Sequence, residues 1–173
     1  MSSYFLSLLA LSAALVSAAT PQAGKSYTVS PSAHPDLCVV PKGDWDGARL
    51  AIEDCDSSDQ IAWVFDGQSL KNHATQRCVD VLDGGHWNGN GLQTWTCFDH
   101  NTNQRFDSSS GAIQWLDTGM CLDLTDGQSS PGTYLQVSSA PQLSVLILAL
   151  AMLRRQHQPA MGIPRGRGGR GLR

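Results

Sequence analysis

The sequence has 173 residues, 41% of them hydrophobic, and a formal net charge of −3, which suits one globular domain with extensions. Residues 1–137 hold six basic and all fifteen acidic side chains, whereas residues 138–173 hold six arginines and no acidic residue. The acidic body argues against nucleic acid and anionic membranes as partners, and the change of sign predicts two physically different segments.

The chain begins with an apolar run from Tyr4 to Val16, followed by small residues at positions 17–19. The run is too short to span a bilayer comfortably and has the length of the hydrophobic part of a secretory signal, and the small residues suit a signal peptidase. We therefore expect a signal peptide at residues 1–19, a secreted, extracellular protein and no membrane span in the mature chain. A buried N-terminal helix is the alternative interpretation.

Residues 20–35 are rich in Pro, Ser and Ala and are expected to form a lead-in segment. Beyond them, short apolar runs alternate with clusters of Gly, Asp, Asn and Ser, and no sustained helical periodicity occurs before residue 138. This pattern predicts an all-β domain. One phrase recurs with its cysteines 40 and 43 residues apart, namely Leu37-Cys38-Val39-Val40, Arg77-Cys78-Val79-Asp80-Val81 and Met120-Cys121-Leu122-Asp123-Leu124.

Two further phrases recur downstream of these cysteines. Trp63-Val64-Phe65-Asp66 is aligned with Gln104-Arg105-Phe106-Asp107. The other phrase is Leu50-Ala51-Ile52-Glu53-Asp54-Cys55, then Leu92-Gln93-Thr94-Trp95-Thr96-Cys97, then Leu135-Gln136-Val137. The sequence thus predicts three units of about 40 residues with roughly four short strands each, which must share one core because each is too small alone.

The five cysteines are an odd number, so one thiol is left over in an oxidising compartment. The matched spacing within the first two units predicts disulfides Cys38–Cys55 and Cys78–Cys97, with Cys121 free. A zinc site is a poor alternative, because no two cysteines stand two to four residues apart.

The second unit carries an ordered set of motifs: Cys-x-Asp-x, a Gly/Asn turn, Leu-Gln-x-Trp-x-Cys and Asn-Gln-x-aromatic, from Cys78 to Phe106. This set resembles the repeat of ricin-B-type lectins. The resemblance covers about residues 36–137 and implies a β-trefoil with pseudo-threefold repeats. The third repeat is expected to be truncated, because the phrase stops after Val137.

The resemblance implies one complete carbohydrate site, in the second repeat. Sugar recognition needs a carboxylate that accepts hydrogen bonds from hydroxyl groups and an aromatic ring that covers the apolar C–H face. By similarity, Asp80 is the carboxylate and Trp95 the stacking ring, Asn103 binds a hydroxyl group, and Gln93 and Gln104 orient Asp80 or reach the sugar. Galactose-type and xylose-type glycans are both candidate ligands.

Some alternatives stay open at this point. Trp87 or His86, on the Gly/Asn-rich loop, could be the stacking group instead of Trp95. The first repeat has Val40 in place of the aspartate, so its pocket is expected to be inactive. The third repeat has Asp123 and Gln136 but lacks the aromatic and Asn-Gln elements.

No enzyme is expected. Glu53 is the sole glutamate, which leaves little for a glycosidase acid/base pair, and the common hydrolase, zinc-protease and phosphate-loop motifs are missing. Asp99 to Asn103 starts like a calcium loop, but Gln104 and Ser110 stand where Gly and Glu are needed. Neither a cofactor nor a metal is therefore predicted. A stand-alone lectin is the first function, and a carbohydrate-binding module derived from a glycosidase or a β-trefoil protease inhibitor are the alternatives.

Residues 138–173 do not continue the repeat. They hold an apolar run of 11 residues, Leu143–Leu153, and then a Gly/Arg-rich stretch. We expect a disordered tail outside the β-trefoil, of the kind that a retained intron or a shifted reading frame produces. A membrane-associating tail is the alternative, although 11 apolar residues fall short of the ~20 that a span needs.

Overall fold

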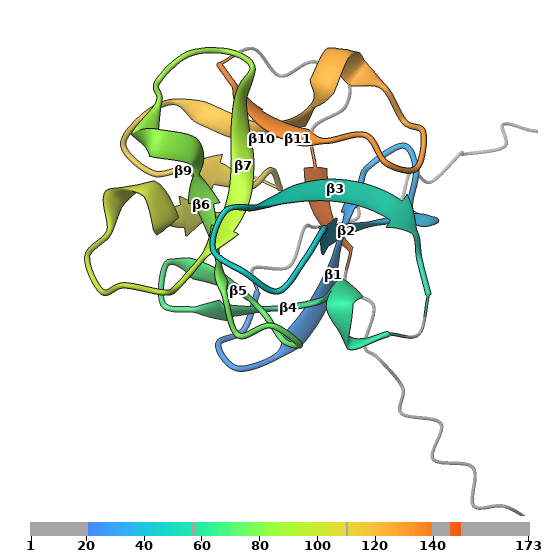
Figure 1. The fold of residues 1–173 in the computed structure, drawn as a ribbon, viewed down its shortest axis with the longest axis horizontal. Helices are drawn as coiled ribbons and strands as arrows, with labels where there is room; N and C mark the ends of the chain where they lie inside the picture. The colour runs from blue at the N-terminus through green and yellow to red at the C-terminus, as the bar shows by residue number, and fades with distance from the viewer. Residues whose placement is uncertain (1–20, 57, 110, 140–145, 150–173) are drawn as a thin grey trace, which may run out of the picture.

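The computed structural model describes residues 21–56, 58–109, 111–139 and 146–149 (Figure 1). The signal peptide expected at residues 1–19 lies outside the described residues. The described chain is all-β, as predicted, with twelve strands and four single-turn 3-10 helices. Its strands are β1 (Ser26–Pro31), β2 (Leu37–Pro41), β3 (Ala48–Asp54), β4 (Ala62–Asp66), β5 (Ser69–Asn72), β6 (Cys78–Val81), β7 (Asn90–Trp95), β8 (Phe106–Asp107), β9 (Gln114–Trp115), β10 (Met120–Leu124), β11 (Leu135–Ser138) and β12 (Leu146–Ala149).

Three antiparallel hairpins, β2–β3, β6–β7 and β10–β11, form the centre of the fold. Strand β7 also pairs with β3 and with β11, so the second hairpin joins the other two. Figure 1 shows the three hairpins arranged around the middle of the ribbon. With four strands to each unit, β1–β4, β5–β8 and β9–β12, this is a β-trefoil, as the resemblance implied. Within the described residues, no helix has the length and apolar character that crossing a membrane requires.

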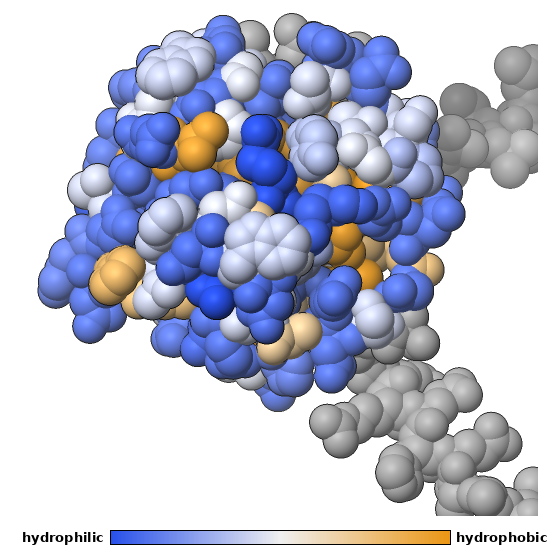
Figure 2. Space-filling model, viewed as in Figure 1, coloured by the Kyte–Doolittle hydropathy of each residue, from blue (hydrophilic) through white to orange (hydrophobic). Residues whose placement is uncertain are grey.

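The core is built from the alternating apolar residues of the hairpins, because successive side chains of a strand point to opposite faces. Leu50, Leu92 and Leu135 begin the same phrase in the three units, and each is 0% exposed. They lie in one cluster with Val39, Val79 and Leu122 from the partner strands. The three units therefore share a single core, while the face drawn in Figure 2 is mostly polar.

Two segments expected outside the domain contribute strands to it. Strand β1 lies within the expected lead-in, residues 20–35, and pairs with β4. Strand β12 lies within the expected tail, residues 138–173, and pairs with the other side of β1, from Thr28↔Ala149 to Pro31↔Leu146. The third unit then has four strands, so the truncation predicted from the motifs is not found at the level of strands. The physical reason is that pairing depends on the backbone, which an apolar segment without the repeat motif also supplies.

Candidate functional site

The three hairpins repeat one register, which defines equivalent positions. The cysteine that begins each phrase faces Glu53, Trp95 or Ser138 on the partner strand. The residue two positions after each of these cysteines also faces the partner strand, in the pairs Val40↔Ala51, Asp80↔Gln93 and Asp123↔Gln136. The second unit alone has an aspartate, a glutamine and a tryptophan at these positions.

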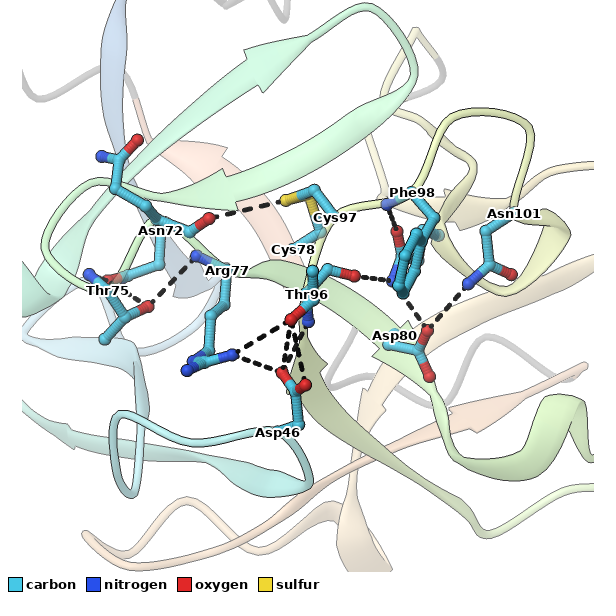
Figure 3. The surroundings of a disulfide bond; sticks show 12 residues. Asp46, Asn72, Thr75, Arg77, Cys78, Asp80, Thr96, Cys97, Phe98 and Asn101 are labelled. Atoms are coloured by element: carbon cyan, nitrogen blue, oxygen red, sulfur yellow. Dashed lines mark hydrogen bonds and ion pairs between the residues drawn. A yellow bond between two sulfur atoms is a disulfide. The ribbon is translucent and has the colours of Figure 1, made fainter.

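Asp80 lies on β6 with its carboxylate buried; the residue is 4% exposed. Its Oδ1 accepts a hydrogen bond from Gln93 Nε2 at 3.1 Å. Its Oδ2 accepts from Gln104 Nε2 at 3.0 Å and from Asn101 Nδ2 at 3.4 Å, the latter drawn in Figure 3. Burial raises the pKa of Asp80, and the three amide donors oppose that rise. The amide donors fix the orientation of the carboxylate.

Gln104 ends the 3-10 helix η3 (Thr102–Gln104) and is fully buried. Besides donating to Asp80, its Nε2 donates to the carbonyl of Thr96 at 3.0 Å, and its Oε1 accepts from the backbone N–H of Phe98 at 2.9 Å. The amide therefore has a defined orientation with the N–H groups toward Asp80. Of the two roles that the sequence left open for Gln104, the geometry fits the orienting one.

Asp80 lies at a hollow of about 220 Å³. Trp95, at the end of β7, is 37% exposed there. Larger hollows of about 270, 330 and 430 Å³ occur among the described residues, but none of them is lined by a buried carboxylate. The lining of the Asp80 hollow is Asp80, Asp83, Gln93, Trp95, Phe98, Asn101 and Asn103.

Asn103 lines the hollow, and its side-chain amide makes no hydrogen bond to another described residue. The side chain lies against Gly84 in helix η2 (Leu82–Gly84), where an added Cβ would stand 2.8 Å from Asn103 Oδ1. Gly84 has φ +62, a left-handed conformation that suits glycine. Glycine thus leaves room for an amide that can still donate and accept at a ligand.

The structure brings together four of the five predicted site residues at the hollow, and Gln104 lies behind Asp80. The two alternative stacking groups are not among the lining residues. His86 packs edge-on against Trp115, with ring centroids 5.3 Å apart, and the Trp87 indole lies over Gly85.

Sequence reasoning missed three lining residues, Asp83, Phe98 and Asn101. Phe98 follows directly after Cys97, and Asn101 stands two residues before Asn103, so both lie within the matched segment. Their roles depend on the loop conformation, since Asn101 Oδ1 also accepts the N–H of Asn103 at 3.0 Å and begins helix η3.

The first repeat has an apolar pair where the second has the Asp80–Gln104 pair. Helix η1 (Asp59–Ile61) precedes β4 as η3 precedes β8, which places Ile61 at the position of Gln104. The sequence alignment of Trp63 with Gln104 is therefore wrong by two residues. Ile61 and Val40 are both buried in one cluster with Cys38. The expected inactive pocket is thus filled by hydrocarbon.

The third repeat keeps part of the second. Gln136 Nε2 donates to Asp123 Oδ2 at 3.2 Å, as Gln93 does to Asp80. The following 3-10 helix η4 (Thr125–Gly127) resembles η2 in its central residue, Asp126, which has φ 54, against 52 at Asp83. Ser138 occupies the position of Trp95, so this repeat has no aromatic ring there.

Both predicted disulfides are present. Cys38–Cys55 and Cys78–Cys97 have Cα–Cα distances of 5.0 and 5.1 Å, within the usual range. Cys121 has a free thiol, whose pKa is raised by burial and by the nearby charge of Asp123.

The sequence matches the ricin-type beta-trefoil lectin domain over residues 25–143. The match covers more than half of the chain and starts before β1. The chain belongs to this family of lectin domains, which confirms the resemblance seen in the motifs. No curated protein matches the sequence.

Solved structures with the same fold include a designed threefold-symmetric protein, ThreeFoil, with a TM-score of 0.62 and 16% identity, over 70% of this chain and 94% of that one. The C-half of the earthworm R-type lectin, solved with GalNAc, has a TM-score of 0.60 and 13% identity, over 72% and 97%. The lectin domain of a Vibrio vulnificus hemolysin/cytolysin, solved with N-acetyl-D-lactosamine, has a TM-score of 0.55 and 18% identity, over 72% and 93%. At these identities the likeness establishes the fold.

Proposed function

We propose that this chain is a secreted carbohydrate-binding lectin domain with one complete sugar site, formed by the second repeat. The observation that carries the proposal is the buried Asp80 carboxylate, held by three amide donors beside the exposed ring of Trp95. An ionised carboxylate accepts about four hydrogen bonds, and Asp80 Oδ1 accepts one from the described residues. The remaining capacity of Oδ1 is available to a sugar hydroxyl group.

Each other predicted residue then has a defined part. Trp95 covers the apolar C–H face of a pyranose, which removes apolar surface from water. Asn103 donates to and accepts from a second hydroxyl group, and Gln93 and Gln104 keep Asp80 in place. The ligand is a galactose-type or xylose-type glycan. Secretion is supported by the apolar N-terminal run and by two disulfides, which persist in oxidising compartments.

A glycan array followed by titration calorimetry tests the proposal. One small polar site should give an affinity of about 1 mM, near −4 kcal/mol. Trp95→Ala should remove binding, whereas Trp87→Ala, which replaces an exposed tryptophan that does not line the hollow, should leave it unchanged. A protein that bound no glycan would favour the protease-inhibitor alternative, which a protease inhibition assay checks.

A further inference from the structure

A loop of the first repeat lies against the ring of Trp95. Gly47, at the end of this β2–β3 loop, donates its N–H to the carbonyl of Thr94 at 2.9 Å. Asp46 Oδ1 accepts the N–H of Thr96 at 2.6 Å. The loop is therefore bound to the residues on both sides of Trp95. A Cβ at Gly47 would stand 3.7 Å from Cζ3 of the Trp95 ring, so the backbone of the loop packs next to the indole.

Charged contacts hold this loop in place. Both carboxylate oxygens of Asp46 accept from the hydroxyl of Thr96, and Asp46 also forms an ion pair with Arg77, as Figure 3 shows. Arg77 Nε lies 3.2 Å from Asp44 Oδ1 on the same loop. The negative charge of Asp46 contributes to the raised pKa of Asp80, which agrees with a loop close to the candidate site. Four side chains from two repeats thus fix the position of the loop.

The loop carries an exposed aromatic ring, Trp45, which is 58% exposed. Its six-membered ring lies directly on Gly43, where an added Cβ would stand 1.9 Å from Cζ3. The carbonyl of Trp45 accepts the N–H of Ala48 at 3.2 Å. Trp45 stands two residues before Gly47, so the Cα atoms of the two residues are at most about 7 Å apart. The backbone at Trp45 therefore lies near the contact between Gly47 and Trp95, and the Trp45 ring itself is exposed to solvent.

We propose that Trp45 is the stacking platform of a second sugar subsite, so that the ligand of this domain is an oligosaccharide. This inference rests on the proposed function. One pyranose occupies the Asp80 hollow on Trp95, and the neighbouring pyranose of the same chain lies on Trp45. Aromatic rings of this kind bind the C–H faces of sugars by removing apolar surface from water. The first repeat, whose own pocket is filled by Val40 and Ile61, thereby contributes to the site of the second.

Titrations of the full chain with two pairs of ligands test the subsite: galactose and lactose, and xylose and xylotriose. The parent protein should bind the oligosaccharide of the preferred pair about five- to tenfold more tightly than its monosaccharide. Trp45→Ala should remove this gain and leave the monosaccharide affinity unchanged. Trp45→Phe keeps an aromatic face and should retain most of the gain. Trp87→Ala is the matched control, since Trp87 is 60% exposed on another loop and should have no effect.

Equal affinities of the parent protein for the monosaccharide and the oligosaccharide would overturn the subsite, and so would an equal loss for both ligands in Trp45→Ala. In either case, the proposed function would still hold if the parent protein bound a sugar and Asp80→Ala abolished that binding. If none of the four sugars bound to the parent protein, the proposed function and the subsite would both fail. Thermal melting of each variant shows that it is folded, and Trp45→Phe gives a second measurement should Trp45→Ala not fold.

Discussion

Gln104 donates a hydrogen bond to Asp80, with Gln104 Nε2 and Asp80 Oδ2 3.0 Å apart and both side chains buried. A buried carboxylate is unfavourable unless such donors surround it. At the equivalent positions of the first repeat, Ile61 and Val40 are both buried in one hydrophobic cluster. The same two positions are therefore occupied by a hydrogen-bonded polar pair in the second repeat and by an apolar pair in the first. In each repeat, the favourable burial of one member depends on the other.

The pairing predicts a strong coupling between substitutions in the first repeat. Val40→Asp should lower the free energy of unfolding by about 3–5 kcal/mol, because the new carboxylate is buried without a donor. Adding Ile61→Gln supplies the donor and should recover about 1–3 kcal/mol. Urea unfolding of the two single variants and the double variant measures the coupling. Additive losses would contradict the equivalence of Ile61 with Gln104.

Glycan affinity should fall with decreasing pH at values above 3.8, the ordinary pKa of an aspartate. Burial raises the pKa of Asp80, and the protonated carboxyl group is a weaker acceptor for sugar hydroxyl groups. Titration calorimetry across the acidic range measures the effect, with far-UV circular dichroism at each pH to show that the domain is folded. An affinity independent of pH down to 3.8 would argue against an ionised Asp80 as the sugar ligand.

The same raised pKa predicts the stability of Asp80→Asn. The folded protein binds the proton of Asp80 more tightly than the unfolded chain, so the ionised group lowers the free energy of unfolding at neutral pH. This destabilisation disappears as the pH falls through the folded-state pKa. The substituted amide can be accommodated if the Gln93 amide turns over, so Asp80→Asn should melt at the parent temperature or above it at pH 7. A clearly lower melting temperature would contradict this assignment.

The three units of roughly four short strands were predictable, because the periodic phrases are local in sequence and repeat. Asp80 and Gln93 are 13 residues apart, as are Asp123 and Gln136, and both pairs face each other across their hairpins. The repeat also predicted both disulfides. These features need no knowledge of how distant loops meet.

The remaining features depend on non-local packing. The hydrogen bond from Asn101 to Asp80 requires the conformation of a loop without periodicity. The contact between Gly47 and Trp95 connects the first repeat to the second, and the motifs within each repeat give no information about contacts between repeats. The pairing of β12 with β1 comes from an apolar segment that has no repeat motif.

Strand β12 predicts a difference between two truncated chains. Removing residues 151–173 leaves β12 in place and should change the melting temperature little. Removing residues 140–173 deletes β12 and leaves one edge of β1 unpaired, which should lower the melting temperature and promote aggregation. Calorimetry and size-exclusion chromatography compare the two chains. Equal stability of both would show that the domain does not depend on β12.

Cys121 should be the one cysteine that a thiol reagent modifies in the folded, oxidised protein. Modification with iodoacetamide should be slow at neutral pH, because burial and Asp123 raise the pKa of the thiol and the thiolate is the reactive form. Intact-mass spectrometry should find one added group, and peptide mapping should place it at Cys121. Two or more added groups would mean that one of the disulfides is not formed.

The most direct test of the central claim is the affinity of Asp80→Ala for the glycan that the parent protein prefers on an array. Losing a hydrogen bond to a charged group costs about 1.5–3 kcal/mol, roughly a ten- to hundredfold loss that would make millimolar binding undetectable. Melting curves of Asp80→Ala and Asp80→Asn identify any loss that comes from unfolding. The account predicts folded variants that no longer bind the glycan. A folded Asp80→Ala variant that binds it as tightly as the parent protein would contradict the account.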